Sequence, residues 1–311
     1  MKNTKLLVAG IATALSLGYG ASALAIPAPG TANATSNLLI TNFKISGGND
    51  EIGGGYQLTT EITNLSGAST GVTTSRLTGF ADQSNSFSET VSASPATYSV
   101  TSSRGVVGNG ARGESTTSGN AFDFVGTGDT VTVKASAELN QSATAGSTGT
   151  QGLASISFRV TEDFRAQIAF DAELIMLAAL GAPENGFAKS IVNWSMTLTD
   201  NTDDSFLTWA PASGTTGLSG EGDLFDSALN YGDAKSLNRT LQTTTGSYDK
   251  SFSLLDGYFE IEADLIAGRT YSLALDQRNE VDIGQVVPEP TTLALLGLGM
   301  LGMGAARRRK A

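Results

Sequence analysis

The clearest fold signal in this chain reads Tyr258-Phe259-Glu260-Ile261-Glu262-Ala263-Asp264-Leu265. Apolar and acidic side chains alternate along it with a period of two, which is typical of a β-strand with one buried face. The pattern predicts two opposite faces. The core face would carry Phe259, Ile261, Ala263 and Leu265, and the solvent face would carry Glu260, Glu262 and Asp264.

A turn and a second short strand follow this stretch. Ala267-Gly268-Arg269 supplies the glycine that tight turns favour, and residues 271–275 alternate again as Tyr-Ser-Leu-Ala-Leu. We therefore expect a β-hairpin at the end of the domain.

Strand signals recur through most of the chain and are separated by Gly, Ser, Asn and Asp. Short runs rich in Val, Ile, Phe, Tyr and Thr predict strands at residues 38–45, 56–63, 97–101, 130–139, 153–160 and 191–199. Residues 164–180 end in a run that fits either a helix or a buried strand, and the Gly-Ala-Pro that follows favours one long strand. Residues 140–152 are expected to be a flexible loop, and no second core is expected within residues 81–129. The predicted fold class is all-β, a β-sandwich of jelly-roll type.

The composition excludes several kinds of chemistry. The 311 residues contain no Cys and no His, which removes disulfides, Ser-His-Asp and Cys-His catalysis, and His-ligated zinc. The formal net charge is −11. With both termini removed, 13 basic and 29 acidic residues would remain, a net charge of about −16. Such a surface repels nucleic acid, so that partner is not expected.

The N-terminus has the three parts of a secretory signal peptide. Lys2 and Lys5 precede an apolar run at residues 6–17, and Ala23-Leu24-Ala25 is a small-x-small cleavage site. Signal peptidase is therefore an expected processing partner, acting on Ala23 and Ala25. The predicted organisation is a signal peptide at 1–25, a linker at 26–37, a β-sandwich domain at 38–285 and a tail at 286–311.

The tail combines a rigid motif, an apolar segment and a basic end. Val287-Pro288-Glu289-Pro290 is held extended by its prolines. Residues 291–306 form a 16-residue apolar run, shorter than the roughly 20 residues of a comfortable membrane helix. The basic end consists of Arg307, Arg308, Arg309 and Lys310, which would stay on the cytoplasmic side.

This tail resembles the PEP-CTERM sorting signal of Gram-negative bacteria, also called an ice-binding-protein C-terminal motif. The resemblance covers residues 286–311 only. It implies that an exosortase, a membrane enzyme with a catalytic cysteine, cleaves the tail and that Pro288, Glu289 and Pro290 are the residues it recognises. It further implies an inner-membrane intermediate, a destination at the cell surface or outside the cell, and an association with exopolysaccharide and biofilm.

Clusters of carboxylates are the candidate sites within the domain. Asp200, Asp203 and Asp204 could supply oxygen ligands to Ca²⁺. The EF-hand glycine and distant Glu are missing, however, and a polar hairpin turn after the strand that ends at Thr199 is the favoured interpretation. The set Glu221, Asp223 and Asp226 could support glycoside hydrolysis, or could lie in a solvated loop. No other metal or cofactor is expected.

Aromatic side chains are the remaining candidates, because exposed rings can stack on sugars. Core packing is the alternative for most of them, and Trp209, which stands beside Pro211 rather than in a clear strand like Trp194, is the one we expect to be exposed. The threonines show no regular Thr-x-Thr ladder in the sequence.

The sequence thus predicts a non-enzymatic protein of the cell surface or extracellular matrix that is sorted by an exosortase and contacts extracellular polysaccharide. Two alternatives stay open. One is a secreted polysaccharide-active enzyme that uses carboxylates such as Glu221 and Asp226. The other is a calcium-dependent adhesion or carbohydrate-binding module that uses Asp200, Asp203 and Asp204.

Overall fold

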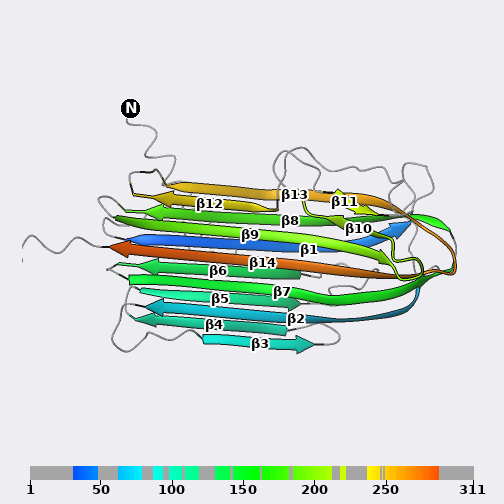
Figure 1. Ribbon diagram of the computed structural model, residues 1–311, viewed down its shortest axis with the longest axis horizontal. Helices are drawn as coiled ribbons and strands as arrows, with labels where there is room; N and C mark the ends of the chain where they lie inside the picture. Colours follow the sequence, from blue (N-terminus) through cyan, green and yellow to red (C-terminus); the bar gives the residue numbers. More distant parts are fainter. Residues whose placement is uncertain are drawn as a thin grey trace, which may run out of the picture.

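The computed structural model places two antiparallel sheets face to face (Figure 1). It describes residues 31–47, 62–78, 87–93, 98–106, 109–118, 130–140, 143–161, 163–181, 185–211, 218–221, 237–245, 247 and 249–286. Every element in those ranges is a strand. The β-sandwich prediction is therefore confirmed. Within the same ranges no helix is long and apolar enough to span a bilayer.

The first sheet has six strands in the order β13-β8-β1-β6-β5-β4. Their bounds are β1 Ala32–Gly47, β4 Tyr98–Val106, β5 Asn109–Ser118, β6 Thr130–Leu139, β8 Phe164–Leu180 and β13 Lys250–Leu265. The run at residues 164–180 forms the single long strand that was predicted. Strand β1 begins at Ala32, so the second half of the predicted linker belongs to the sheet.

The second sheet has eight strands, in the order β11-β10-β9-β14-β7-β2-β3 with β12 also paired to β9. Their bounds are β2 Ile62–Thr78, β3 Phe87–Ala93, β7 Ala143–Val160, β9 Asn185–Asp200, β10 Phe206–Trp209, β11 Leu218–Glu221, β12 Arg239–Thr244 and β14 Thr270–Val286. The flexible loop predicted at residues 140–152 is wrong, because β7 already begins at Ala143. Ser147 and Gly149 of this strand pack against the opposite sheet, and a Cβ on Gly149 would lie 2.6 Å from Glu114 O.

The predicted hairpin at the end of the domain is wrong in its pairing, although its strands are in place. Strand β13 pairs with β8 in the six-stranded sheet, whereas β14 pairs with β7 and β9 in the eight-stranded sheet. The turn at residues 266–269 therefore crosses from one sheet to the other. It is held by the Gly268 amide, which donates to Val160 O at 2.8 Å, and Gly268 has a φ of 80° that favours glycine.

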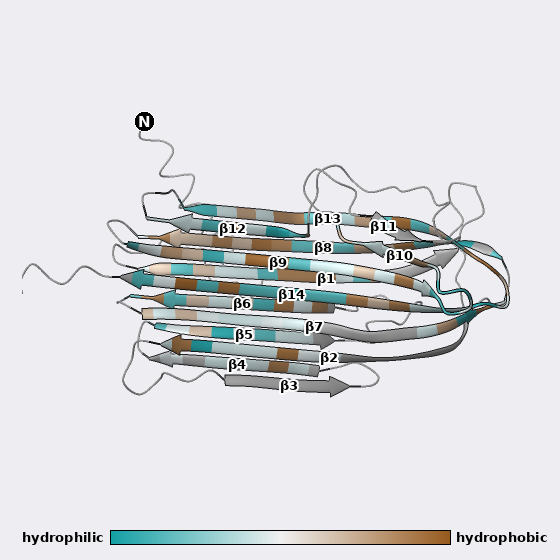
Figure 2. Cartoon of the chain, viewed as in Figure 1, coloured by the Kyte–Doolittle hydropathy of each residue, from teal (hydrophilic) through white to brown (hydrophobic). Residues whose placement is uncertain are grey.

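Aromatic rings fill one part of the space between the sheets. Phe170 of β8 stacks on Phe259 of β13 with ring centroids 5.2 Å apart, and it meets Trp194 of β9 at 4.8 Å and Trp209 of β10 at 5.7 Å. All four side chains are at most 2 % exposed. Apolar and polar residues alternate along the strands (Figure 2), as expected for sheets that each bury one face.

Small residues fill another part of the interior and bring the sheets very close. A Cβ built on Gly113 of β5 would lie 2.2 Å from the carbonyl oxygen of Thr148 in β7. Ser147 Oγ reaches the opposite backbone, 2.9 Å from Arg112 O and 3.0 Å from Ser136 O. Asn279 Nδ2 likewise donates to Val133 O across the gap at 2.8 Å. Side chains of one sheet thus hydrogen-bond directly to the backbone of the other.

Candidate functional site

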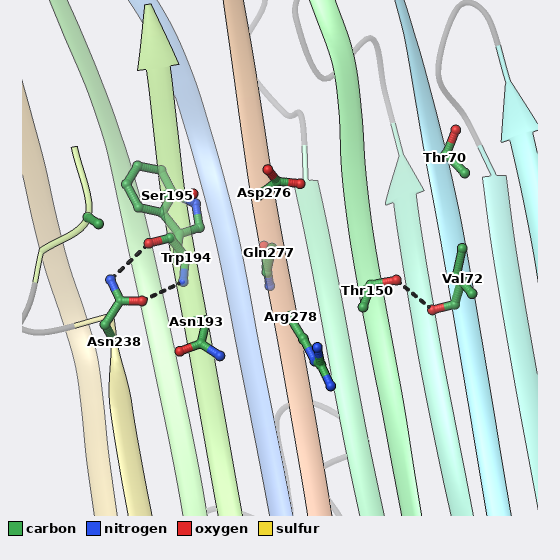
Figure 3. A pocket seen from close by; sticks show the side chains of 11 residues that line it. Thr70, Val72, Thr150, Asn193, Trp194, Ser195, Asn238, Asp276, Gln277 and Arg278 are labelled. Carbon is green, nitrogen blue, oxygen red and sulfur yellow. Dashed lines mark hydrogen bonds between the residues drawn. The ribbon is translucent and has the colours of Figure 1, made fainter. Parts of the chain in front are cut away.

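A groove of about 420 Å³ lies on the outer face of the eight-stranded sheet (Figure 3). It crosses strands β2, β7, β14 and β9, so a rigid sheet forms its floor. Its lining residues are Thr70, Val72, Thr150, Asn193, Trp194, Ser195, Ala210, Asn238, Asp276, Gln277 and Arg278. Most of these residues carry polar side chains, although apolar atoms make up most of the surface that lines the groove.

Two irregularities of the sheet meet at this groove. The pairing of β14 with β7 shifts register between Leu273 and Asp276, as in a β-bulge. Strand β9 is paired along one edge by two separate strands, with β12 beside residues 187–192 and β10 beside residues 196–199. Residues 193–195 therefore lie at a break between these two partners.

The side chain of Asn238 bridges this break. Its Oδ1 accepts a hydrogen bond from Trp194 N at 2.9 Å, and its Nδ2 donates to Trp194 O at 2.8 Å (Figure 3). The Nδ2 also lies 3.0 Å from Pro211 O. An amide side chain thus reproduces the pairing that a neighbouring strand would give, and it fixes the backbone beneath the groove.

The polar side chains of the groove include both charges and neutral groups. Asn193, Asp276 and Arg278 are exposed, and Arg278 Nη2 also pairs with Glu280 at 2.7 Å. Thr150 Oγ1 donates to Val72 O at 3.1 Å. In contrast, Gln277 turns inward and donates from Nε2 to Leu38 O at 3.0 Å in the opposite sheet. The exposed amide, carboxylate and guanidinium of Asn193, Asp276 and Arg278 therefore supply the groove with both donors and acceptors beside its apolar surface.

The two tryptophans do not form a sugar-stacking platform. Trp209 is fully buried and Trp194 is 2 % exposed, and their rings meet edge to face at 5.6 Å. The predicted exposure of Trp209 is wrong, because β10 places this side chain on the inward face of its sheet. The proline that follows ends the strand without exposing the ring.

Asp200 is the buried last residue of β9, and Asp203 and Asp204 lie in the turn that joins β9 to β10. Arg269 Nη1 donates to Asp200 Oδ2 at 2.8 Å and also pairs with Asp203. Ser205 donates to Asp203 from its hydroxyl at 2.6 Å and from its backbone N–H at 3.0 Å. These bonds from Ser205, together with the Arg269 guanidinium, hold the pKa of Asp203 below its usual range.

The arginine occupies the place where a cation would sit between two of these carboxylates. The third, Asp204, is exposed and has a φ of 61°, a left-handed turn conformation. Within the described ranges no three acidic side chains gather in a way that could hold a metal ion. The geometry therefore favours an internal ion pair over a calcium site.

The other carboxylate candidates that the structure describes do not line the groove. Glu221 ends β11, while Asp223 and Asp226 are outside the described residues. Glu262 and Asp264 pair with Arg165 on the outer face of the six-stranded sheet, as a solvated face would allow. Glu260 departs from the prediction: it is only 7 % exposed, and it accepts hydrogen bonds from Gln167 Nε2 at 2.6 Å and from the Tyr258 hydroxyl.

The fold and the tail together define an all-β sandwich followed directly by a C-terminal sorting signal. A family model described as the PEP-CTERM protein-sorting motif matches residues 286–310. This match confirms the resemblance seen in the tail, and it marks the chain as an exported protein that is processed by an exosortase. The predicted signal peptide with Ala23 and Ala25, the residues Val287 to Pro290 and the basic end lie outside the described residues.

Comparisons with curated proteins and with solved structures identify no related protein. No curated protein matches the chain. Among solved structures, one titled "Structure of infectious bursal disease virus Gx strain" aligns with 10 % identity over 86 % of each chain and a TM-score of 0.10, a value too low to carry an argument.

Sequence reasoning missed the groove. Asn193, Asp276 and Arg278 occupy ordinary outward positions of strands, and nothing in their local pattern separates them from other polar residues. Asn238 stands between the buried Leu237 and the start of β12 at Arg239, and nothing in its local pattern marks it either.

Proposed function

We propose that this protein is a non-enzymatic component of the cell surface or extracellular matrix and that it binds extracellular polysaccharide in the groove of the eight-stranded sheet. The observation that carries the proposal is the mixture of hydroxyl, amide, carboxylate and guanidinium groups on a rigid floor. A sugar hydroxyl both donates and accepts hydrogen bonds, and it is recognised best by donors and acceptors held at fixed positions.

Three side chains would do most of the recognition. Asn193 supplies an amide that donates and accepts, Asp276 supplies a carboxylate that only accepts, and Arg278 supplies N–H donors. All three stand on paired strands, so little backbone ordering would accompany binding. The acidity of the mature protein favours a neutral polysaccharide over an anionic one.

The absence of Cys and His from the sequence supports the non-enzymatic reading, since it leaves only carboxylate chemistry for hydrolysis. Export through the sorting signal supports a role outside the cell. The association with exopolysaccharide and biofilm is the setting we propose for this binding.

The test uses residues 26–287 incubated with exopolysaccharide purified from the host, with and without chelator, and measures co-sedimentation and new reducing ends. We expect co-sedimentation without new reducing ends. Asn193→Ala combined with Asp276→Asn should abolish the binding. The matched control Asn33→Ala changes an outward-facing asparagine of β1 on the other sheet and should bind normally.

Each other outcome contradicts part of the proposal. New reducing ends would show an enzyme. Binding that survives the groove variant would place the site elsewhere, and loss of binding in chelator alone would favour the calcium-dependent alternative. No binding at all would exclude polysaccharide as the ligand under these conditions.

A further inference from the structure

The sorting motif begins almost at the edge of the folded sheet. Strand β14 stays paired through Val286, which lies opposite Asn185 of β9, and Pro288 follows with one residue between them. Gln285 is paired on both sides, with Gly186 of β9 and Ala143 of β7. A residue spans at most about 3.6 Å, so the motif starts within roughly 7 Å of the last pair.

This end of β14 is packed tightly rather than loosely joined. A Cβ built on Gly284 would lie 2.5 Å from the ring of Phe187, which therefore covers that backbone. Gln285 is 3 % exposed. The neighbouring strand is fastened in turn, because Gly186 N donates to Thr245 Oγ1 at 2.9 Å and Thr245 N donates to Gly186 O at 3.1 Å.

An enzyme that cleaves a peptide chain needs access to backbone groups that a sheet keeps paired. Enzymes that cut within a chain commonly bind several residues on each side of the cut in an extended form, through backbone hydrogen bonds. Cleavage at the Pro-Glu-Pro motif would place residues 284–286 beside the active site. Residues 284 and 285 are already paired with both neighbours of β14, and Val286 is paired with β9, as is usual for a strand inside a sheet (Figure 1).

We propose that residues 284–286 belong to the segment that the exosortase binds, and that the end of β14 must leave the sheet before the tail is processed. The free energy needed to open this strand end would then set the rate at which the tail is cleaved. Local opening of a strand end has a lower free energy than global unfolding, so the rest of the sandwich can remain folded. This inference rests on exosortase processing and is independent of polysaccharide binding.

The test follows cleavage of the full chain in its host by pulse-chase, reading the mass of the C-terminus. A disulfide between Asn185→Cys and Val286→Cys would hold the end of β14 closed in an oxidising compartment, in a chain that has no other cysteine. We expect at least a tenfold slower cleavage. The matched control, Thr199→Cys with Ser272→Cys, joins the same two strands at their other end and should leave the rate unchanged.

A second variant moves the motif away from the sheet. Ten Gly and Ser residues inserted after Val286 should raise the cleavage rate several-fold and should restore cleavage in the chain that carries the 185–286 disulfide. Equal rates with and without this disulfide would overturn the proposal. If the two thiols stay reduced, the insertion alone decides, and an unchanged rate would then overturn it.

Discussion

Replacing Gly113 with Ala tests the close approach of the two sheets. The new Cβ would lie 2.2 Å from Thr148 O, a backbone atom, whereas real Cβ contacts do not fall below 3.0 Å. The sheets would therefore have to part by about 0.8 Å at this point. The contacts of Ser147 Oγ with Arg112 O and Ser136 O, now 2.9 and 3.0 Å, would lengthen beyond hydrogen-bonding distance.

The expected loss of stability follows from these two effects. Overpacking costs about 1–3 kcal/mol, and each lost hydrogen bond costs about 1 kcal/mol. The lower entropy of the unfolded chain with alanine offsets about 0.5–1 kcal/mol. The free energy of unfolding should therefore fall by about 2–4 kcal/mol, which lowers Tm by roughly 4–16 °C in a domain of this size.

The assay is thermal and urea unfolding of residues 26–287, followed by circular dichroism. The control is Gly105→Ala, an exposed position in β4 where the new Cβ would lie 3.2 Å from Asn109 O, and it should change Tm little. A Gly113→Ala variant with a Tm within 2 °C of the unmodified protein would refute the close approach of the sheets at this point.

Three further perturbations have defined outcomes. Asn238→Ala leaves both backbone groups of Trp194 without their partner, so the free energy of unfolding should fall by about 2–4 kcal/mol. The Trp194 amide should then exchange its hydrogen rapidly, and continued protection of this amide would contradict the bridging role. Burial raises the pKa of Tyr271 to about 12, so the folded state keeps a proton that the unfolded state releases near pH 10. The stabilising contribution of this residue is complete below pH 10 and is lost as the pH rises toward 12. Tyrosinate absorbance and circular dichroism should therefore change together in this pH range. Arg269→Met removes the cation from a buried carboxylate and should lower Tm more than the matched Arg278→Met at an exposed ion pair, and equal effects would contradict this.

Strong alternation in the sequence predicted strands correctly. The sequence did not predict which strands pair with each other. The alternation from Phe259 to Leu265 correctly placed four side chains in the core. It could not show that β13 and β14 belong to different sheets, because a strand buries the same face whether its successor pairs beside it or opposite it. Glu260 likewise has an outward position in the pattern, yet Gln167 and Tyr258 enclose it.

The candidate site depended on tertiary contacts to a greater extent than the fold did. The closeness of Asp203 to Arg269 could not be foreseen across 66 residues of chain. The groove exists because two strands end beside Trp194 and because Asn238 closes the break, and both facts come from pairing. The sorting signal was predictable in full, since an enzyme reads it as a linear sequence.

The position of β14 also has a consequence for how the chain folds. This last strand pairs with β7 on one side and β9 on the other, so the eight-stranded sheet stays in two separate pieces until it arrives. Strand β1, from the start of the domain, likewise cannot complete its pairing until β6 and β8 have been synthesised. Such non-local pairing slows folding and leaves unpaired strand edges open to aggregation meanwhile. We therefore expect that the chain acquires its native structure only after the whole domain has been synthesised, which favours export in an unfolded form.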